Sequence, residues 1–214
     1  MHFSTISVLG LAAVASAESI SVTPHASYAS SAGVLGCKID TNRVAYWPGA
    51  PDCNNMCVKV SNGGRSVHLL HVDQSAGAHD ISYDAWNYLV TGKGATEDPT
   101  QGGGFAVEYE NVHMSECAHL IKTDDGKLAF EAANSINFLA SCINEPSTWI
   151  AQNYAVWNIA NSVCTLGIDE ECTLDLATSN QPTCPHTLGL QEPLSDLAVV
   201  NIDYGTGATS RAVQ

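Results

Sequence analysis

Apolar and polar residues alternate in short segments over the middle of the chain. Residues 57–61 (CVKVS) and 65–73 (RSVHLLHVD) have the period of two that is typical of half-buried β-strands. Asn62-Gly63-Gly64 between them favours a hairpin turn. On the second strand, His71 and Asp73 fall on the same face. A further strand is predicted at 105–112.

A helical period replaces this alternation in three places. In residues 80–90 the apolar positions form one stripe, with Ser82 at the N-cap position and Trp86 on the buried side. After Cys117, residues 130–142 and 146–164 also carry apolar residues at helical spacing. We therefore predict a helical region over residues 118–188.

The two ends of the chain are different in character. An apolar run followed by Ala15-Ser16-Ala17 indicates a secretory signal peptide over residues 1–17, although a buried helix is the alternative. The run is shorter than the roughly 20 residues that cross a membrane. Residues 18–36 are expected to be a polar lead, and residues 189–214 a loosely ordered tail.

The charge balance restricts the partners. Eight Lys and Arg against 22 Asp and Glu give a net charge of −14. Such a surface repels phosphate backbones and anionic lipids, so we expect no nucleic-acid or membrane partner. It suits a neutral or cationic ligand on a soluble, monomeric protein.

The cysteines indicate an oxidising compartment. All eight follow the predicted cleavage site, and an even number in an exported chain predicts four disulfides. A zinc site is the alternative, but the short two-residue spacing of zinc ligands is missing. Four cysteines precede residue 118 and four follow it, as expected if each of two regions is cross-linked by its own disulfides. The eight are Cys37, Cys53, Cys57, Cys117, Cys142, Cys164, Cys172 and Cys184.

Three segments, in order, resemble the barwin/expansin-like double-psi β-barrel superfamily. Residues 57–74 resemble its hairpin leading to an Asp, residues 79–89 its strand-to-helix segment, and residues 102–117 its closing strand ending in a cysteine. The resemblance implies a mainly β protein. Its six-stranded double-psi barrel is expected at residues 37–117, with a disulfide-linked helical extension after it. It also implies a Cys57–Cys117 disulfide.

The same resemblance points to Asp80 as the candidate catalytic residue. In expansin-like barrels and family-45 endoglucanases, the Asp at this place is a proton donor or its relic. The endoglucanases supply a second carboxylate after an aromatic pair, but here Pro48 follows Tyr46 and Trp47, and Asp52 is displaced. Asp80 alone favours binding over hydrolysis. A helix N-terminal anion is the alternative role.

Further residues are candidates for contacts with a sugar. Tyr46 and Trp47, between Pro and Gly residues, are expected as exposed aromatics on a loop, unless one plugs the barrel end. Asp73, His79 and Tyr83 are expected at the same groove. His71, Asp73, His79 and Asp80 could instead build a metal site, but we expect neither metal nor cofactor because a strand histidine is more often a hydrogen-bonded, partly buried group.

The leading hypothesis is a secreted, extracellular protein of fungal type that binds, and can loosen, cell-wall polysaccharide without hydrolysis, at a host surface. A second is an apoplastic effector or protease inhibitor that binds a host extracellular protein through the barrel. A third is a weak glycoside hydrolase using Asp80 with Asp52 or Asp73.

Overall fold

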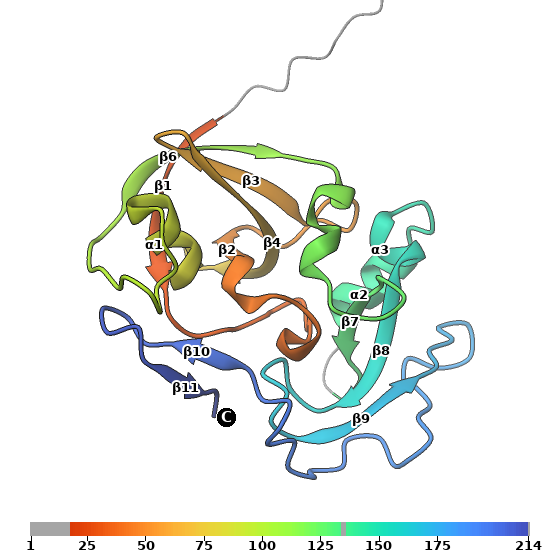
Figure 1. Ribbon diagram of the computed structural model, residues 1–214. Helices are drawn as coiled ribbons and strands as arrows, with labels where there is room; N and C mark the ends of the chain where they lie inside the picture. Colours follow the sequence, from red (N-terminus) through yellow and green to blue (C-terminus); the bar gives the residue numbers. More distant parts are fainter. Residues whose placement is uncertain (1–17, 134–135, 214) are drawn as a thin grey trace, which may run out of the picture.

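Six strands close into a barrel in the computed structural model (Figure 1), which describes residues 18–133 and 136–213. The predicted signal peptide, residues 1–17, lies outside the described residues. The order around the barrel is β1-β5-β2-β4-β3-β6. The bounds are β1 Glu18–His25, β2 Val44–Pro48, β3 Cys57–Asn62, β4 Arg65–Ser75, β5 His79–Ser82 and β6 Phe105–Asn111.

The barrel mixes two kinds of pairing. The β1–β5 and β2–β4 pairs are parallel and the other four pairs are antiparallel. The predicted hairpin is confirmed as β3 and β4, and Gly63 and Gly64 have φ of +54° and +83°. This turn needs positive φ at both central positions, which glycine adopts without strain. The predicted strand at 105–112 is confirmed as β6.

A helix joins β5 to β6, as predicted. It is α1 (Tyr83–Thr91), with Ser82 at its N-cap position and Trp86 buried. The Ser82 hydroxyl donates to the Asn42 carbonyl, at 2.6 Å, instead of capping the helix. Asp84 then accepts from the Ala95 amide and pairs with Arg43 at 2.7 Å. These bonds fix the place where β5 turns into the helix.

The barrel begins earlier than the sequence indicates. The expected polar lead, residues 18–36, contains β1, which pairs with β5 on one edge and with β6 on the other. Ile20 and Val22 point inward among the serines, and Val22 is fully buried. Two apolar residues are too few to stand out in a Ser-rich segment, although their alternation is that of a strand.

The extension is built around strands, so the predicted helical region over residues 118–188 is wrong. Its sheet has the order β7-β8-β9. The apolar run Tyr154–Ile159 is the central strand of this sheet, and such a run fits a buried strand as well as a buried helix. The elements are β7 Leu128–Glu131, β8 Tyr154–Ile159 and β9 Gly167–Cys172, with short helices α2 Asn137–Ile143 and α3 Trp149–Gln152. Single 3-10 turns lie at Gly36–Lys38 and Thr41–Arg43, and a longer one at Met114–Leu120.

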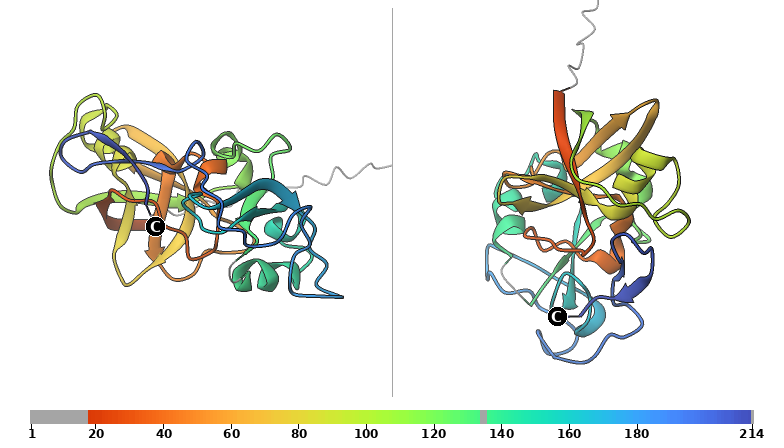
Figure 2. Two further views of the ribbon diagram at one scale, coloured as in Figure 1. Left: turned by 90° about the horizontal axis from the view of Figure 1, so that it is seen from below. Right: turned by 90° about the vertical axis from the view of Figure 1, so that its left-hand side faces the viewer.

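The C-terminal segment is ordered against the barrel, contrary to the expected loose tail over residues 189–214. Its hairpin consists of β10 (Val200–Ile202) and β11 (Thr209–Arg211), seen in Figure 2 beside the barrel. The Tyr204 hydroxyl bonds to both the amide and the carbonyl of Gly102, each at 2.7 Å. A few aromatic anchors therefore hold a segment whose composition is that of a loop.

Four disulfides join the described residues, and Cys57–Cys117 is among them, as the resemblance implied. Cys37–Cys164 and Cys53–Cys142 cross from the barrel region to the extension, and Cys172–Cys184 is local. The expectation of two separately stapled regions is therefore wrong. One apolar cluster likewise combines barrel and extension side chains. Among the described residues, no helix is long and apolar enough to cross a membrane.

We expect the two kinds of disulfide to differ in their effect on stability. Cys53 and Cys142 are 89 positions apart and Cys172 and Cys184 only 12. On chain entropy alone, the double alanine variant of the first pair should lose about 4–5 kcal/mol and that of the second about 3 kcal/mol. Urea unfolding of both variants measures this, and equal losses would contradict the entropic account.

Candidate functional site

Three of the predicted site residues meet in one row across the barrel. Thr23 on β1 pairs in register with Asp80 on β5, Asp80 pairs with Tyr46 on β2, and Tyr46 pairs with Asp73 on β4. A register shift after Ala45 brings Asp73 opposite Tyr46. We call these four residues, Thr23, Asp80, Tyr46 and Asp73, the Asp80 row.

Both carboxylates of the row are fixed by hydrogen bonds. The Thr23 hydroxyl donates to Asp80 Oδ1. Asp73 Oδ1 accepts from the backbone amides of Ser31 and Gln74, at 2.8 and 2.9 Å. Both residues are half-buried. Because an ionised carboxylate has about four acceptor positions, each still has lone pairs for a further donor.

Tyr46 lies buried between the two carboxylates, not exposed on a loop as expected. It is 3% exposed, its hydroxyl donates to the Ser27 carbonyl at 3.3 Å, and the His25 ring lies 4.5 Å away, centroid to centroid. Burial raises the pKa of its hydroxyl, and the charges of Asp73 and Asp80 raise that pKa further. Tyr46 is therefore neutral and offers no face for a sugar to stack on.

Trp47 points to the other side of β2 and closes one end of the barrel. Its ring is 6% exposed and lies 4.8 Å from Tyr109, 5.4 Å from His79 and 5.7 Å from His71. We also expected Trp47 to be exposed on a loop, and this is wrong. Tyr46 and Trp47 belong to a strand, in which neighbouring side chains face opposite sides. The alternative reading, that one of the two plugs the barrel end, holds for Trp47.

The same alternation separates His79 from Asp80. His79 lies against Trp47 inside the barrel end, whereas Asp80 belongs to the outer row. Within residues 18–133 and 136–213, no three His, Cys, Asp or Glu side chains are grouped so that they could hold a metal ion.

Tyr83 and Asp52 lie away from the row. Tyr83 is 2% exposed; its hydroxyl donates to the Thr100 carbonyl and accepts from the Gly205 amide, so it anchors the C-terminal hairpin. Asp52 is exposed in the loop after β2 and accepts from the Asn54 amide at 2.7 Å. Of the two carboxylates considered as partners for Asp80, only Asp73 shares its row.

A shallow hollow of about 430 Å³ opens beside the row, along β1 and the start of β5. It connects the row to solvent through Thr23. Ser21 and Thr23 were not predicted as site residues, because both fall in residues 18–36, which we expected to be a polar lead. The alternation of Ser, Ile, Ser, Val and Thr was the signal that could have indicated a strand there. The lining residues are Ile20, Ser21, Thr23, Gly77, Ala78 and His79.

Comparison with protein-family models, with curated proteins and with solved structures finds no match for this chain.

Trp47→Ala should destabilise the fold. Removing a buried indole leaves a cavity at the barrel end, so we expect the free energy of unfolding to fall by about 3–5 kcal/mol. Trp47→Phe, which keeps an aromatic plug, should lose less. Urea unfolding measures both, and a loss below about 1 kcal/mol for Trp47→Ala would show that the ring does not fill the barrel end.

Acidification should destabilise the barrel end through its histidines. Burial lowers the pKa of His71 and of His79. The unfolded chain therefore binds more protons below about pH 6.5, and the free energy of unfolding falls as the pH drops through that value. Between about pH 7 and pH 5, His71→Gln should flatten this dependence. Chemical unfolding at several pH values measures it, and an unchanged slope would contradict it.

Proposed function

We propose that this protein is secreted and binds neutral cell-wall polysaccharide at the Asp80 row, without hydrolysing it. The row itself carries the proposal: two fixed, half-buried carboxylates share a row whose Thr23 lines an open hollow. Carboxylate oxygens accept hydrogen bonds from the vicinal hydroxyls of sugars, and bonds to charged groups are the stronger ones.

An expansin-like double-psi barrel is the fold we propose for this chain. The two parallel pairs within a closed barrel of six strands support it, as do the Cys57–Cys117 disulfide and the position of Asp80 on β5, the strand that leads into α1. In proteins of that kind the Asp at this place lies in the polysaccharide groove. The four disulfides support secretion, since they persist in oxidising compartments.

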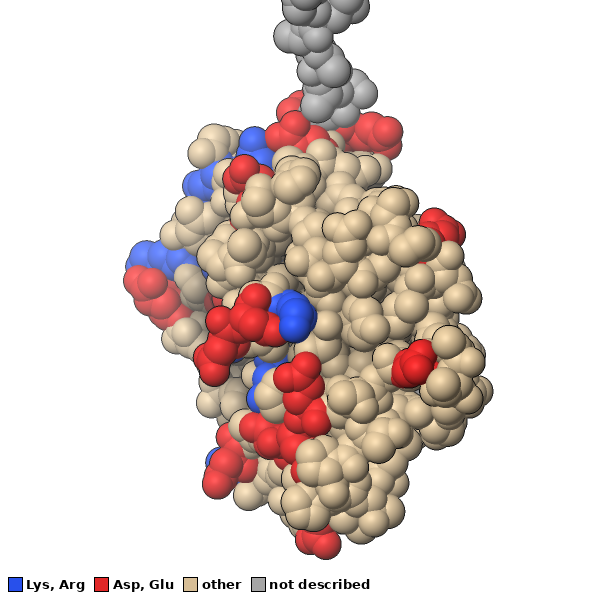
Figure 3. Space-filling model, turned by 90° about the vertical axis from the view of Figure 1, so that its right-hand side faces the viewer, with Lys and Arg blue, Asp and Glu red and all other residues tan. Residues whose placement is uncertain are grey.

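A neutral ligand is favoured by the charge of the surface. On the face shown in Figure 3, Asp and Glu outnumber Lys and Arg and lie mainly along one side and at the top. The field of such a surface repels anionic polymers and leaves uncharged glycans unaffected. Binding then depends on hydrogen bonds at the row, because its aromatic member, Tyr46, is covered.

The position of Tyr46 argues against hydrolysis. Asp80 and Asp73 are two strands apart, so their backbones are separated by roughly 10 Å. An inverting glycosidase has a comparable distance between its carboxyl groups, but the gap must hold the attacking water and the sugar. Here the buried Tyr46 ring occupies the row between them.

Asp80→Asn tests the binding site. In a sedimentation assay, at least one of the insoluble polysaccharides cellulose, chitin and β-1,3-glucan should retain the wild-type protein. Loss of the charged acceptor should weaken that retention about tenfold. Asp124→Asn is the matched control, since Asp124 is exposed in a turn of the extension and the variant changes the charge equally. The control should bind like the wild type.

Two results would overturn the proposal. If none of the three polysaccharides retains the protein, the wall-binding function fails. If soluble reducing sugar is released by the wild type and not by Asp80→Asn, the protein is a hydrolase that uses the row as its acid and base.

A further inference from the structure

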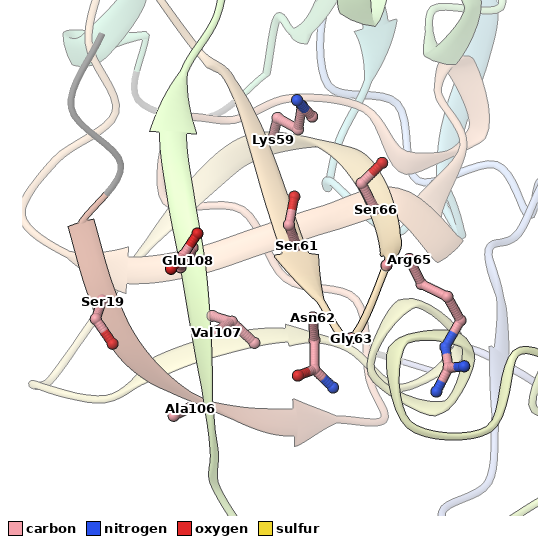
Figure 4. Close-up of a pocket in the computed structure, with 11 residues that line it drawn as sticks. Ser19, Lys59, Ser61, Asn62, Gly63, Arg65, Ser66, Ala106, Val107 and Glu108 are labelled. Atoms are coloured by element: carbon pink, nitrogen blue, oxygen red, sulfur yellow. The ribbon is translucent and has the colours of Figure 1, made fainter.

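A polar groove lies on a different part of the barrel wall from the hollow beside Thr23, over β6 and β3 and beside the hairpin turn. It has a volume of about 560 Å³, against about 430 Å³ for the hollow beside Thr23. Figure 4 shows its lining side chains, which come from β1, β6, β3 and β4. The sequence interpretation assigned no function to these residues.

Four of the lining residues form a lateral row of their own. Ser19 on β1 pairs in register with Glu108 on β6, Glu108 with Ser61 on β3, and Ser61 with Ser66 on β4. We call these four the Glu108 row. Within the described residues, no hydrogen-bond partner is found for the three serine hydroxyls or for the Glu108 carboxylate. Ser61 is half-buried, and the other three residues of the row are exposed.

The positive charges at this groove are already neutralised or bonded. Lys59 Nζ pairs with Glu110 at 2.8 Å. The Arg65 guanidinium donates to the carbonyls of Leu89 and Val90, at 3.1 and 2.7 Å. Bonds to carbonyls leave the Arg65 charge in place, but they hold the guanidinium at the end of α1, and Figure 4 shows it pointing away from Ser61 and Glu108. An anion at the row would therefore lie beside the Glu108 carboxylate, which disfavours phosphate or sulfate esters as ligands.

The remaining chemistry of the groove is that of hydroxyl recognition. A lone carboxylate is too few ligands for a hard cation, which takes six or more oxygens. Apart from Ala106 and the buried Val107, the lining is polar or glycine, so an apolar ligand gains little contact. Hydroxyls that donate and accept, around one carboxylate acceptor, match a polyhydroxylated neutral molecule.

We propose that the Glu108 row is a second saccharide-binding site, separate from the Asp80 row. On β1, Ser19 and Thr23 are four residues apart, or roughly 13 Å. The strands next to β1 differ as well, since Thr23 faces β5 and Ser19 faces β6. With both sites occupied, one molecule bridges two polysaccharide chains. This bridging rests on the proposed function, because it requires glycan binding at the Asp80 row. The existence of the second site does not depend on it.

Amide NMR spectra of the full-length mature protein, titrated with soluble cellopentaose, laminaripentaose or chitopentaose, test this site. One of the three should shift the amide signals of β6 and β3. Glu108→Ala should weaken that response at least about fivefold, as loss of one charged acceptor predicts, and Ser61→Val, which fills the groove while suiting a strand, should do the same. Glu97→Ala is the control, because Glu97 makes only an exposed pair with Lys93.

The outcomes separate the two sites. The second site is supported if the pentasaccharide still shifts the amide signals of β6 and β3 in Asp80→Asn but no longer does so in Glu108→Ala. This holds whether or not the Asp80 row binds glycan. If binding to insoluble glycan depends on Asp80 while the signals of β6 and β3 never move, this inference is overturned and the proposed function stands. If no pentasaccharide or polysaccharide binds, both fail.

Discussion

The closure of the barrel by β1 is the constraint on which both candidate sites depend. This strand is hydrogen-bonded on both edges, so that Val22 pairs with His79 on one side and with Phe105 on the other. Without it, β5 and β6 would be unpaired edges of an open sheet, which favours association with other chains. The strand also supplies Thr23 to Asp80 and Ser19 to Glu108.

The segment that follows β1 and the extension together determine which part of the barrel wall remains open. The chain after β1 passes over β2 and β4, where Ser27 covers Tyr46 and Ser31 reaches Asp73. The Cys53–Cys142 disulfide and the shared apolar cluster hold the extension beside this face. The Asp80 row is thus covered at Tyr46, on β2, while Thr23 at its β1 end lines the open hollow. Burial of Tyr46 follows from this cover, and with it the loss of space that hydrolysis would need.

Local patterns made part of this structure predictable. The β3–β4 hairpin and α1 depend on neighbouring residues, and their turn, alternation and helical stripe are legible in the sequence. Strand β1 was missed because its pairing partners are some 60 and 85 positions away. Strand β8 was taken for a helix because a mostly buried apolar run has no period that distinguishes a strand from a helix. The sequence pointed to Asp80 and Asp73, which the structure places in one row, but the burial of Tyr46 depends on residues from another part of the chain that fold over it.

Small residues beside β1 keep its outward side chains accessible. Ser21 lies between the two hollows, and a Cβ at position 104 would come within 2.6 Å of its hydroxyl oxygen. Across the strand, Gly77 and Ala78 border the hollow next to Thr23. A bulkier residue on either side would cover hydroxyls that otherwise exchange hydrogen bonds with water. A surface of short hydroxyl side chains, with a carboxylate acceptor in each row, favours many weak contacts over one deep pocket. If each site holds its own polysaccharide chain, as we propose, binding at one site raises the effective concentration of glycan at the other, so weak contacts add up.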